Sequence, residues 1–280
     1  MADQRMSLAL SFIEGHPNSA ARILEQHDLG TVARFITELP EALAVTLLQR
    51  MLPQYVSRLS RSLEVEQFIH LLNSMELSFS AAVLRHLPNG DRQRILARLP
   101  ANRRAACTLL LSFTQDTVGA WLTPLVVTVP DDASISEALN FVRAAGEVVH
   151  SNYIFVVDRD RRLRGRISYV DMLRAEPGLS VDALMFTRCN HLLGRMSLQK
   201  AAEHTDWQTV DVMPVNNRNQ QFIGVLRYVD LRLGLERMNT DAGKTGRIDP
   251  VTGIFEVYGN TLLALFNSLG DVIESDQRQP

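Results

Sequence analysis

Two copies of a short pattern place polar side chains that could bond a phosphate or a sugar at a fixed spacing. In the first copy the Ser168 hydroxyl can bond a phosphate oxygen, and the Asp171 carboxylate can accept from two ribose hydroxyls. In the second copy Arg227 replaces the serine, and Asp230 keeps its place. Arginine can hold a phosphate through two parallel hydrogen bonds, so the second copy is either a phosphate clamp or a degenerate site. The two copies read GRISYVD (165–171) and GVLRYVD (224–230).

The same residues have a purely structural interpretation. Serine and aspartate at the start of a helix cap its free N–H groups, and Ser168 with Asp171 would do so equally well. Gly165 and Gly224 open the two copies, and glycine admits a close backbone approach, whether by a ligand or by another segment. The sequence leaves ligand binding and capping open.

Four carboxylates are the candidates for a divalent cation. A divalent cation with octahedral oxygen coordination needs carboxylates that converge from two surfaces. The candidates are Asp91, Asp116, Asp131 and Asp132. The alternative is that Asp91 caps a helix, Asp116 orders a junction, and Asp131 with Asp132 forms a turn.

Short helices must position the first of these residues. Residues 1 to about 111 contain four Leu-Pro pairs, and proline ends the preceding helix or lies in the first turn of the next. The first pair recurs as the third and the second as the fourth, at intervals that differ by one position, and apolar residues between them follow helical spacing. The segment therefore predicts a helical hairpin array. The pairs end at Pro40, Pro53, Pro88 and Pro100.

Residues 112–171 predict a mixed α/β unit. Leu125 to Val127 reads as a short strand after Pro124, and Ser134 with Glu137 forms a capping box at the start of a helix. Tyr153 to Val157 reads as a buried strand, followed by a turn and a return strand. A second unit repeats this one, with YVD segments at 169–171 and 228–230 and one residue inserted just before the second.

This order of strand, helix, strand, turn, strand and helix resembles a CBS motif. Two such motifs pack face to face as a Bateman module with clefts between them. The segment from Asp116 to Thr123 is similar to the junction between the helical N domain and the first CBS motif in MgtE-type magnesium channels, whose pattern is D-[ST]-[AV]-G-x-[LW]-[ML]-T. The matching residues are Asp116, Thr117, Val118, Gly119, Trp121, Leu122 and Thr123.

The resemblance implies an α+β multidomain fold: an all-α superhelical N domain, a tandem CBS module and a C-terminal amphipathic helix. The expected domains are 1–120, 121–180, 181–240 and 241–280. Related modules bind adenine nucleotides at G-h-h-[ST]-x-x-D, with an aromatic on the preceding strand facing adenine. Arg166 departs from this pattern at its first apolar position. The residues expected at the nucleotide are Tyr153, Arg166, Ser168, Asp171, Arg227 and Asp230.

The charge of the N-terminal region departs from the family. Residues 1–120 carry 12 Arg, no Lys, and 11 Asp and Glu, a balance of +1. The N domain of these channels is usually strongly acidic, because its carboxylates repel one another until a divalent cation bridges them. The balance here predicts a weaker electrostatic attraction for Mg²⁺ than in the family.

Composition excludes several classes of protein. The chain of 280 residues has a net charge of −2, which gives no reason to expect a nucleic acid partner. Two distant cysteines and scattered histidines predict no disulfide framework or zinc site and fit a reducing cytoplasm. We find no signal peptide, no apolar run of about 20 residues and no catalytic motif, so we expect a cytoplasmic protein that is not an enzyme and has no membrane span.

The last part of the chain predicts a polar linker and an amphipathic helix. Residues 239–249 are polar and contain glycine, and residues 254–273 place apolar side chains three or four apart. We expect a homodimeric, ligand-responsive regulatory module that responds to Mg²⁺ or to an adenine nucleotide such as ATP or AMP, with a membrane transporter or another regulatory target as partner. The alternatives are a nucleotide sensor without metal response and a ligand-free scaffold.

Overall fold

The structure is a computed structural model and describes residues 10–144 and 152–242. These residues form two compact units. The first unit ends at Pro100, and the second begins at Ala101. The predicted tail helix of residues 254–273 lies outside the described residues. The domain boundaries expected from the sequence stay a prediction.

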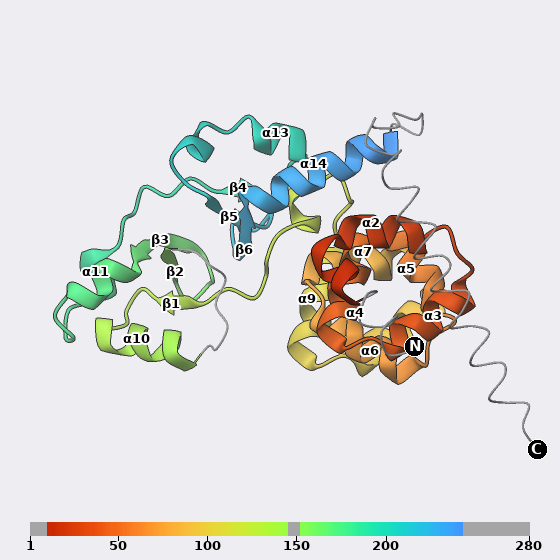
Figure 1. Cartoon of the computed structure of the whole chain (residues 1–280). Coiled ribbons are helices and arrows are strands. Elements are labelled where there is room, and N and C mark those ends of the chain that lie inside the picture. Colours follow the sequence, from red (N-terminus) through yellow and green to blue (C-terminus); the bar gives the residue numbers. More distant parts are fainter. Residues whose placement is uncertain (1–9, 145–151, 243–280) are drawn as a thin grey trace, which may run out of the picture. The chain divides into compact units, whose positions relative to one another are not determined.

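The first unit is a stack of short helices that begin at a constant spacing along the chain. Each helix from α2 to α5 packs on the helix two places further along, so neighbouring pairs form successive turns of a solenoid (Figure 1). The helices are α2 (Pro17–Leu24), α3 (Leu29–Glu38), α4 (Glu41–Arg50), α5 (Pro53–Leu59), α6 (Val65–Ser74), α7 (Leu77–His86) and α8 (Asn89–Arg98). The predicted repeat, from Pro40 before α4 to Pro88 before α8, therefore contains four helices.

Proline sets the ends of several helices. Leu39, Leu87 and Leu99 each precede a proline, and as helix C-caps they are extended, with ψ between 146° and 150°. The residue before proline avoids the α conformation because the proline ring clashes with it. Pro53 differs, since it is the first residue of α5 rather than the residue before the helix. This difference explains why the two predicted intervals differ by one position.

Apolar residues fill the inside of the helical stack. The fully buried side chains with the largest volumes there include Ile36, Leu48, Leu59, Phe68 and Leu72. They lie on successive helices at helical spacing, so each helix contributes one apolar face to a continuous core. Burying a side chain of this size stabilises the fold by about 1.5–3 kcal/mol.

The second unit begins with α9 (Ala101–Leu111) and contains two similar mixed α/β motifs. In each motif the first strand is parallel to the second, and the second is antiparallel to the third. Motif 1 consists of β1 (Thr128–Pro130), α10 (Ile135–Ala144), β2 (Tyr153–Val157), β3 (Leu163–Ser168), α11 (Tyr169–Arg174) and α12 (Val181–Leu184). Motif 2 consists of β4 (Leu192–Leu193), α13 (Leu198–Ala202), η2 (Thr205–Gln208), β5 (Val212–Asn216), β6 (Phe222–Arg227) and α14 (Tyr228–Ala242).

The two hairpins are copies in the same register. Tyr153 pairs with Ser168 in the first, and Val212 pairs with Arg227 in the second. Both turns place a residue with positive φ at the same position, and both ladders shift register at the last residue of their first strand. The offset between the copies is thus constant throughout, and the prediction of one inserted residue in this region is wrong.

The local sequence signals of motif 1 have mixed outcomes. The capping box is confirmed: the Ser134 N–H donates to Glu137 Oε2 at 2.8 Å, and the Glu137 N–H donates to Ser134 Oγ at 3.3 Å. The strand predicted at Leu125–Val127 is wrong, because the strand lies three residues later, at Thr128–Pro130. Leu125 is exposed and Val129 is fully buried, so burial selects the later segment.

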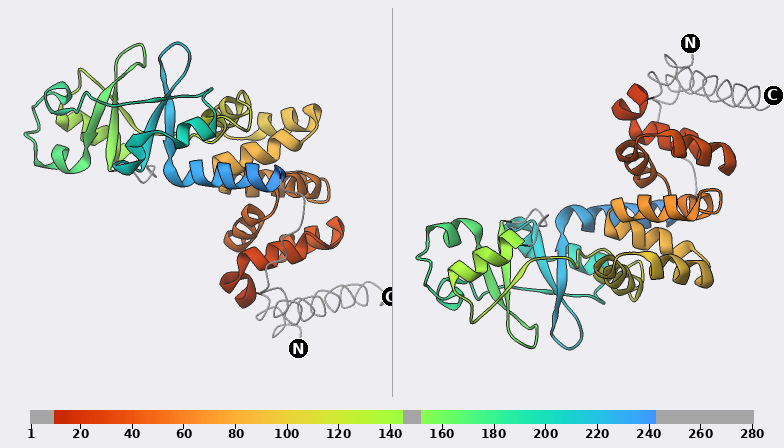
Figure 2. Two further views of the ribbon diagram at one scale, coloured as in Figure 1. Left: turned by 90° about the horizontal axis from the view of Figure 1, so that it is seen from above. Right: turned by 90° about the horizontal axis from the view of Figure 1, so that it is seen from below.

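The two sheets face each other across an aromatic contact. The rings of Phe155 and Phe222 stack with centroids 5.4 Å apart, surrounded by Val157, Val212 and Val225. At the hairpin tips the Phe222 N–H donates to the Arg161 carbonyl at 2.7 Å. Figure 2 shows the β2–β3 and β5–β6 hairpins side by side. The predicted face-to-face pairing of the motifs is confirmed.

The junction before motif 1 is bonded to motif 2. The N–H groups of Val118 and Gly119 donate to Met196 and Gly194 carbonyls at 2.9 and 2.7 Å, and residues 118–122 are buried. The Phe113 ring fills the space beside Gly119 and Gly194. This junction segment is therefore held within the second unit.

Candidate functional site

Arg166 lies at the centre of the face that motif 1 turns toward motif 2. It sits opposite Phe155 in the β2–β3 ladder, and its guanidinium carbon lies 4.3 Å from the ring centroid of Tyr153, the diagonal neighbour on the same face. On its other side the backbone of Arg166 forms a bridge with Phe186, whose ring centroid is 5.5 Å from the guanidinium carbon. Two aromatic side chains therefore hold the arginine in place.

The Nε–H group of Arg166 is buried and has no hydrogen-bond acceptor within the part of the chain that the structure describes. Leaving a buried donor unsatisfied costs about 1–3 kcal/mol, and more when the group is charged. The unsatisfied donor therefore lowers the stability of the folded chain, and the two aromatic rings hold the guanidinium in position. An acceptor that bound beside this guanidinium and reached the Nε–H would remove this cost.

A cavity of about 240 Å³ opens beside Arg166 between the two motifs. Motif 1 contributes Arg166, the linker to motif 2 contributes residues 186–190, and motif 2 contributes Asp206 with residues 209–214. The volume is below the roughly 300–1,000 Å³ of pockets for small molecules, so it suits part of a nucleotide rather than all of it.

The charges around this cavity are mixed. Arg166 and Arg188 carry positive charge, and Asp206 carries negative charge, with its Oδ2 accepting from Asn190 Nδ2 at 2.9 Å. Burial raises the pKa of the Cys189 thiol; the Arg166 charge opposes this shift, and the Asp206 charge adds to it. The thiol therefore stays protonated at neutral pH and does not compete as an anion for Arg166.

The two motif glycines are in contact with protein backbone. A Cβ at Gly165 would lie 2.7 Å from the Phe186 carbonyl oxygen, and one at Gly224 would lie 2.4 Å from the Thr123 carbonyl oxygen. Each carbonyl belongs to the segment that leads into the other motif, and Gly224 has a φ of +146°. The close approach that the sequence allowed is made by a crossing segment, not by space left for a ligand.

Ser168 has the structural role that the sequence left open. Its Oγ accepts from the Val170 N–H at 3.1 Å and caps α11. Asp171 lies exposed in the first turn of that helix. Neither residue lines the cavity beside Arg166.

Arg227 and Asp230 bind each other. Arg227 donates from Nε and Nη2 to the two carboxylate oxygens of Asp230 at 2.6 and 2.8 Å, and Asp230 is only 4% exposed. A bidentate pair of this kind is among the strong charge-assisted hydrogen bonds. Arg227 therefore clamps a carboxylate of its own motif where we expected it to take a phosphate.

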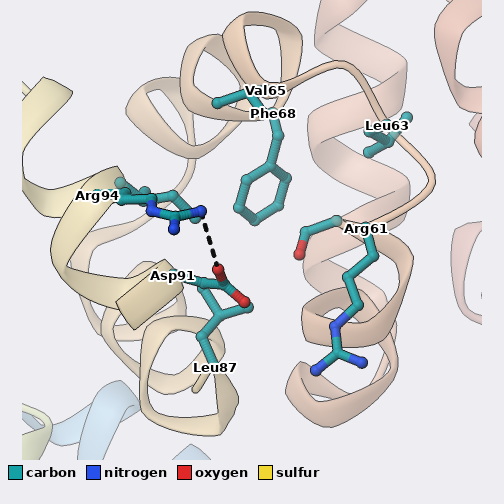
Figure 3. A pocket seen from close by; sticks show the side chains of 9 residues that line it. Arg61, Leu63, Val65, Phe68, Leu87, Asp91 and Arg94 are labelled. Atoms are coloured by element: carbon teal, nitrogen blue, oxygen red, sulfur yellow. Dashed lines mark ion pairs between the residues drawn. The ribbon is translucent and has the colours of Figure 1, made fainter. Parts of the chain in front are cut away.

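The structure does not bring the four predicted metal ligands together. Three of them lie near an arginine, and Asp91 belongs to a different unit from the other three. Asp91 lies in the first unit, 3.8 Å from Arg94, beside Arg61 and Phe68 in a pocket of about 300 Å³ (Figure 3). In the second unit Asp131 pairs with Arg164 at 3.5 Å, Asp132 pairs with Arg159 at 3.1 Å, and Asp116 is exposed in the junction. Across residues 10–144 and 152–242 no group of three or more His, Cys, Asp or Glu side chains could hold a metal ion.

The linker side of the cavity was not predicted from the sequence. Phe186, Arg188 and Asn190 lie in a segment without periodic pattern, and Asp206 lies in the 3₁₀ turn η2. Arg166 was predicted at the nucleotide, although it departs from the family pattern at an apolar position. The sequence feature that could have indicated its role is this charge at a position where an apolar residue is expected. A charged residue in such a place is expected to be paired or functional.

The matches to known families follow this architecture. Residues 15–116 match the MgtE intracellular N domain, and residues 118–178 match the CBS domain. The magnesium transporter MgtE of Bacillus subtilis is 23% identical over 224 residues, which cover 74% of this chain and 48% of the transporter. The magnesium transporter MgtE of Thermus thermophilus is 27% identical over 175 residues, covering 62% of this chain and 39% of that transporter.

Solved structures show the same fold. The cytosolic domain of the Mg²⁺ channel MgtE in complex with ATP superposes with a TM-score of 0.67 at 23% identity, covering 81% of this chain and 98% of that one. The soluble part of a magnesium transporter gives a TM-score of 0.60 at 14% identity, covering 85% and 99%.

A helical N domain followed by a CBS motif is the domain order that these family matches define. This chain is homologous to the cytosolic domain of MgtE magnesium transporters. It spans less than half the length of the two curated relatives. Within the described residues no helix has the length and hydropathy of a membrane span.

Proposed function

We propose that this chain is a ligand-responsive regulatory module of a magnesium transport system and acts on the cytoplasmic side of a membrane. The support is its homology to the cytosolic domain of MgtE together with a cavity that places an unsatisfied arginine donor between the two CBS motifs. A ligand shifts such a module only by its different affinity for two conformations.

The ligands of this proposal are an adenine nucleotide and Mg²⁺. One structural relative is a complex with ATP, and the cavity beside Arg166 offers a positive charge to a phosphate group. Mg²⁺ prefers oxygen ligands and retains several waters, and the carboxylates predicted for it are Asp91 in the first unit and Asp116, Asp131 and Asp132 in the second. The balance of +1 over residues 1–120 lowers the electrostatic attraction for this cation.

We place the movable joint at Pro100, between α8 and α9. The contacts divide the chain at this residue, and the extended Leu99 ends α8 just before it. The segment of residues 118–122, in contrast, is buried and bonded to motif 2. Ligand binding within the second unit would then be transmitted to the first through α9.

The module acts in this proposal as a homodimer. Val170 on α11 and Val229 on α14 occupy equivalent positions of the two motifs, and both are exposed, as is Leu173. A second copy of the chain can cover these apolar side chains on both helices. Light scattering after size exclusion should give a dimer mass for the native chain and a monomer mass for the variant Val170→Glu/Val229→Glu. The control Leu52→Glu changes an exposed apolar residue of the first unit and should remain dimeric.

Calorimetry separates this function from its alternatives. Heat from Mg²⁺ supports a magnesium-responsive module, and heat from ATP or AMP without any from Mg²⁺ supports a nucleotide sensor. Silence with all three ligands supports a ligand-free scaffold and contradicts the proposal. Arg227 and Asp230 bind each other, and Ser168 caps a helix, so these residues favour the alternative of a ligand-free scaffold. The proposal of ligand binding therefore depends on the cavity beside Arg166.

A further inference from the structure

We propose that Arg166 makes the cleft between the two CBS motifs a binding site for phosphate or polyphosphate groups. By covering the ring of Tyr153, Arg166 also prevents a nucleobase from stacking on that ring. The inference rests on the proposed function, because it names what the same cleft selects. It concerns the one position at which the motif GRISYVD carries a charge where an apolar residue is expected.

The ring of Tyr153 is the first part of the argument. An exposed aromatic face stacks on any base, because every base offers a π-face. Here the guanidinium carbon of Arg166 lies 4.3 Å from the ring centroid, at the distance of a stacked cation. A base could reach that face only by displacing the arginine, and it would then lose the cation–π contact and move a charge.

The hydrogen-bonding capacity of Arg166 is the second part. A guanidinium has five N–H donors, and the Nε–H of Arg166 has no hydrogen-bond acceptor among the described residues. Its Nε–H is buried, while the cavity of about 240 Å³ opens beside it. A phosphate group can accept two parallel hydrogen bonds from a guanidinium, because the spacing of its oxygens matches the donor spacing.

The surroundings set the charge and size of the ligand. Arg188 adds a second cation on the linker side, while the Asp206 carboxylate of motif 2 already accepts from Asn190 Nδ2. A short polyphosphate can reach both arginines and leave Asp206 to its amide donor. A nucleoside without phosphate has no anionic group that could bind Arg166 or Arg188.

Binding should therefore depend on phosphate groups rather than on the base. In metal-free buffer at low salt we expect tripolyphosphate and ATP to bind within about threefold of each other and adenosine to bind at least tenfold more weakly, a difference of about 1.4 kcal/mol. Raising the salt should weaken tripolyphosphate and ATP together, since exposed ionic contacts are screened.

The test compares three chains by calorimetry with tripolyphosphate, ATP and adenosine. Arg166→Val should weaken tripolyphosphate at least tenfold and should strengthen adenosine, because the ring of Tyr153 is uncovered. The control Arg174→Val removes an exposed arginine of α11 that does not line the cavity and should leave all three affinities unchanged. If Arg166→Val does not fold by circular dichroism, Arg166→Lys replaces it, with tripolyphosphate retained and adenosine strengthened.

Two results overturn the inference while leaving the proposed function intact: adenosine binding the native chain as tightly as ATP, or tripolyphosphate binding Arg166→Val as tightly as the native chain. Heat from Mg²⁺ without any from ATP or tripolyphosphate has the same meaning. Silence with Mg²⁺, ATP and tripolyphosphate overturns both, so the two failures are distinguishable.

Discussion

Replacing Gly224 with alanine tests the crossing of segments between the two CBS motifs, on which the geometry of the cleft depends. The glycine has a φ of +146°, and a Cβ there would lie 2.4 Å from the Thr123 carbonyl oxygen and 2.9 Å from Pro124 Cα. Both neighbours are backbone atoms, so neither can move as a flexible side chain would. Thr123 in turn is held by two hydrogen bonds to Val225.

The expected cost of this change has two parts. Holding a residue other than glycine in a rare backbone conformation costs about 1–3 kcal/mol. Forcing a methyl group into a filled space costs about 1–3 kcal/mol more. Gly224→Ala should therefore lower the free energy of unfolding by roughly 2–6 kcal/mol. Gly165→Ala meets a carbonyl at 2.7 Å without a positive φ, so only the second part applies.

Urea unfolding followed by circular dichroism measures both variants against Gly178→Ala. A Cβ at Gly178 meets nothing within 4 Å, and an alanine in a compatible conformation stabilises by about 0.4–1 kcal/mol through the unfolded state. The expected order of stability is Gly178→Ala, native, Gly165→Ala, Gly224→Ala. A midpoint for Gly224→Ala equal to that of the native chain would refute the crossed-segment geometry.

Two further changes follow from buried groups. Arg227→Ala should lower the free energy of unfolding by about 3–5 kcal/mol, because it leaves the buried Asp230 carboxylate without its cation, whereas Arg232→Ala breaks only a surface pair and should change it by less than about 1 kcal/mol. Urea unfolding measures both, and equal losses would contradict the buried pair. Burial raises the pKa of Cys107 to about 11 and that of Cys189 in the same direction. Raised values keep both thiols protonated at pH 8, so a disulfide reagent should label the partly accessible Cys189 slowly and the buried Cys107 only in urea; rapid labelling of both in the folded chain would contradict this.

The repeats could be predicted from sequence because they rest on local chemistry. Leu-Pro pairs end helices through a steric effect on one residue, and the capping box at Ser134 depends on a spacing of three. The two YVD segments correspond because each begins the helix after an antiparallel hairpin. Each of these features is decided by residues that are close together in the chain.

The partners of the site residues could not be predicted, because they come from distant parts of the chain or from a choice that only the folded motif makes. Nothing in the sequence indicated that the Phe186 carbonyl would approach Gly165, or that Arg227 would bind Asp230 in preference to a ligand. The strand placed at Leu125–Val127 instead of Thr128–Pro130 has the same origin, since both segments contain apolar residues and only tertiary burial distinguishes them.

Hydrogen exchange of the whole chain, with and without saturating ATP and Mg²⁺, tests the regulatory function most directly. We predict slower exchange on ligand binding in β3 and in residues 209–214, which lie at the cavity, and a changed rate at the start of α9, where the two units join. Unchanged exchange at the cavity and at this joint under saturating ligand would contradict a module that senses a ligand and transmits its binding.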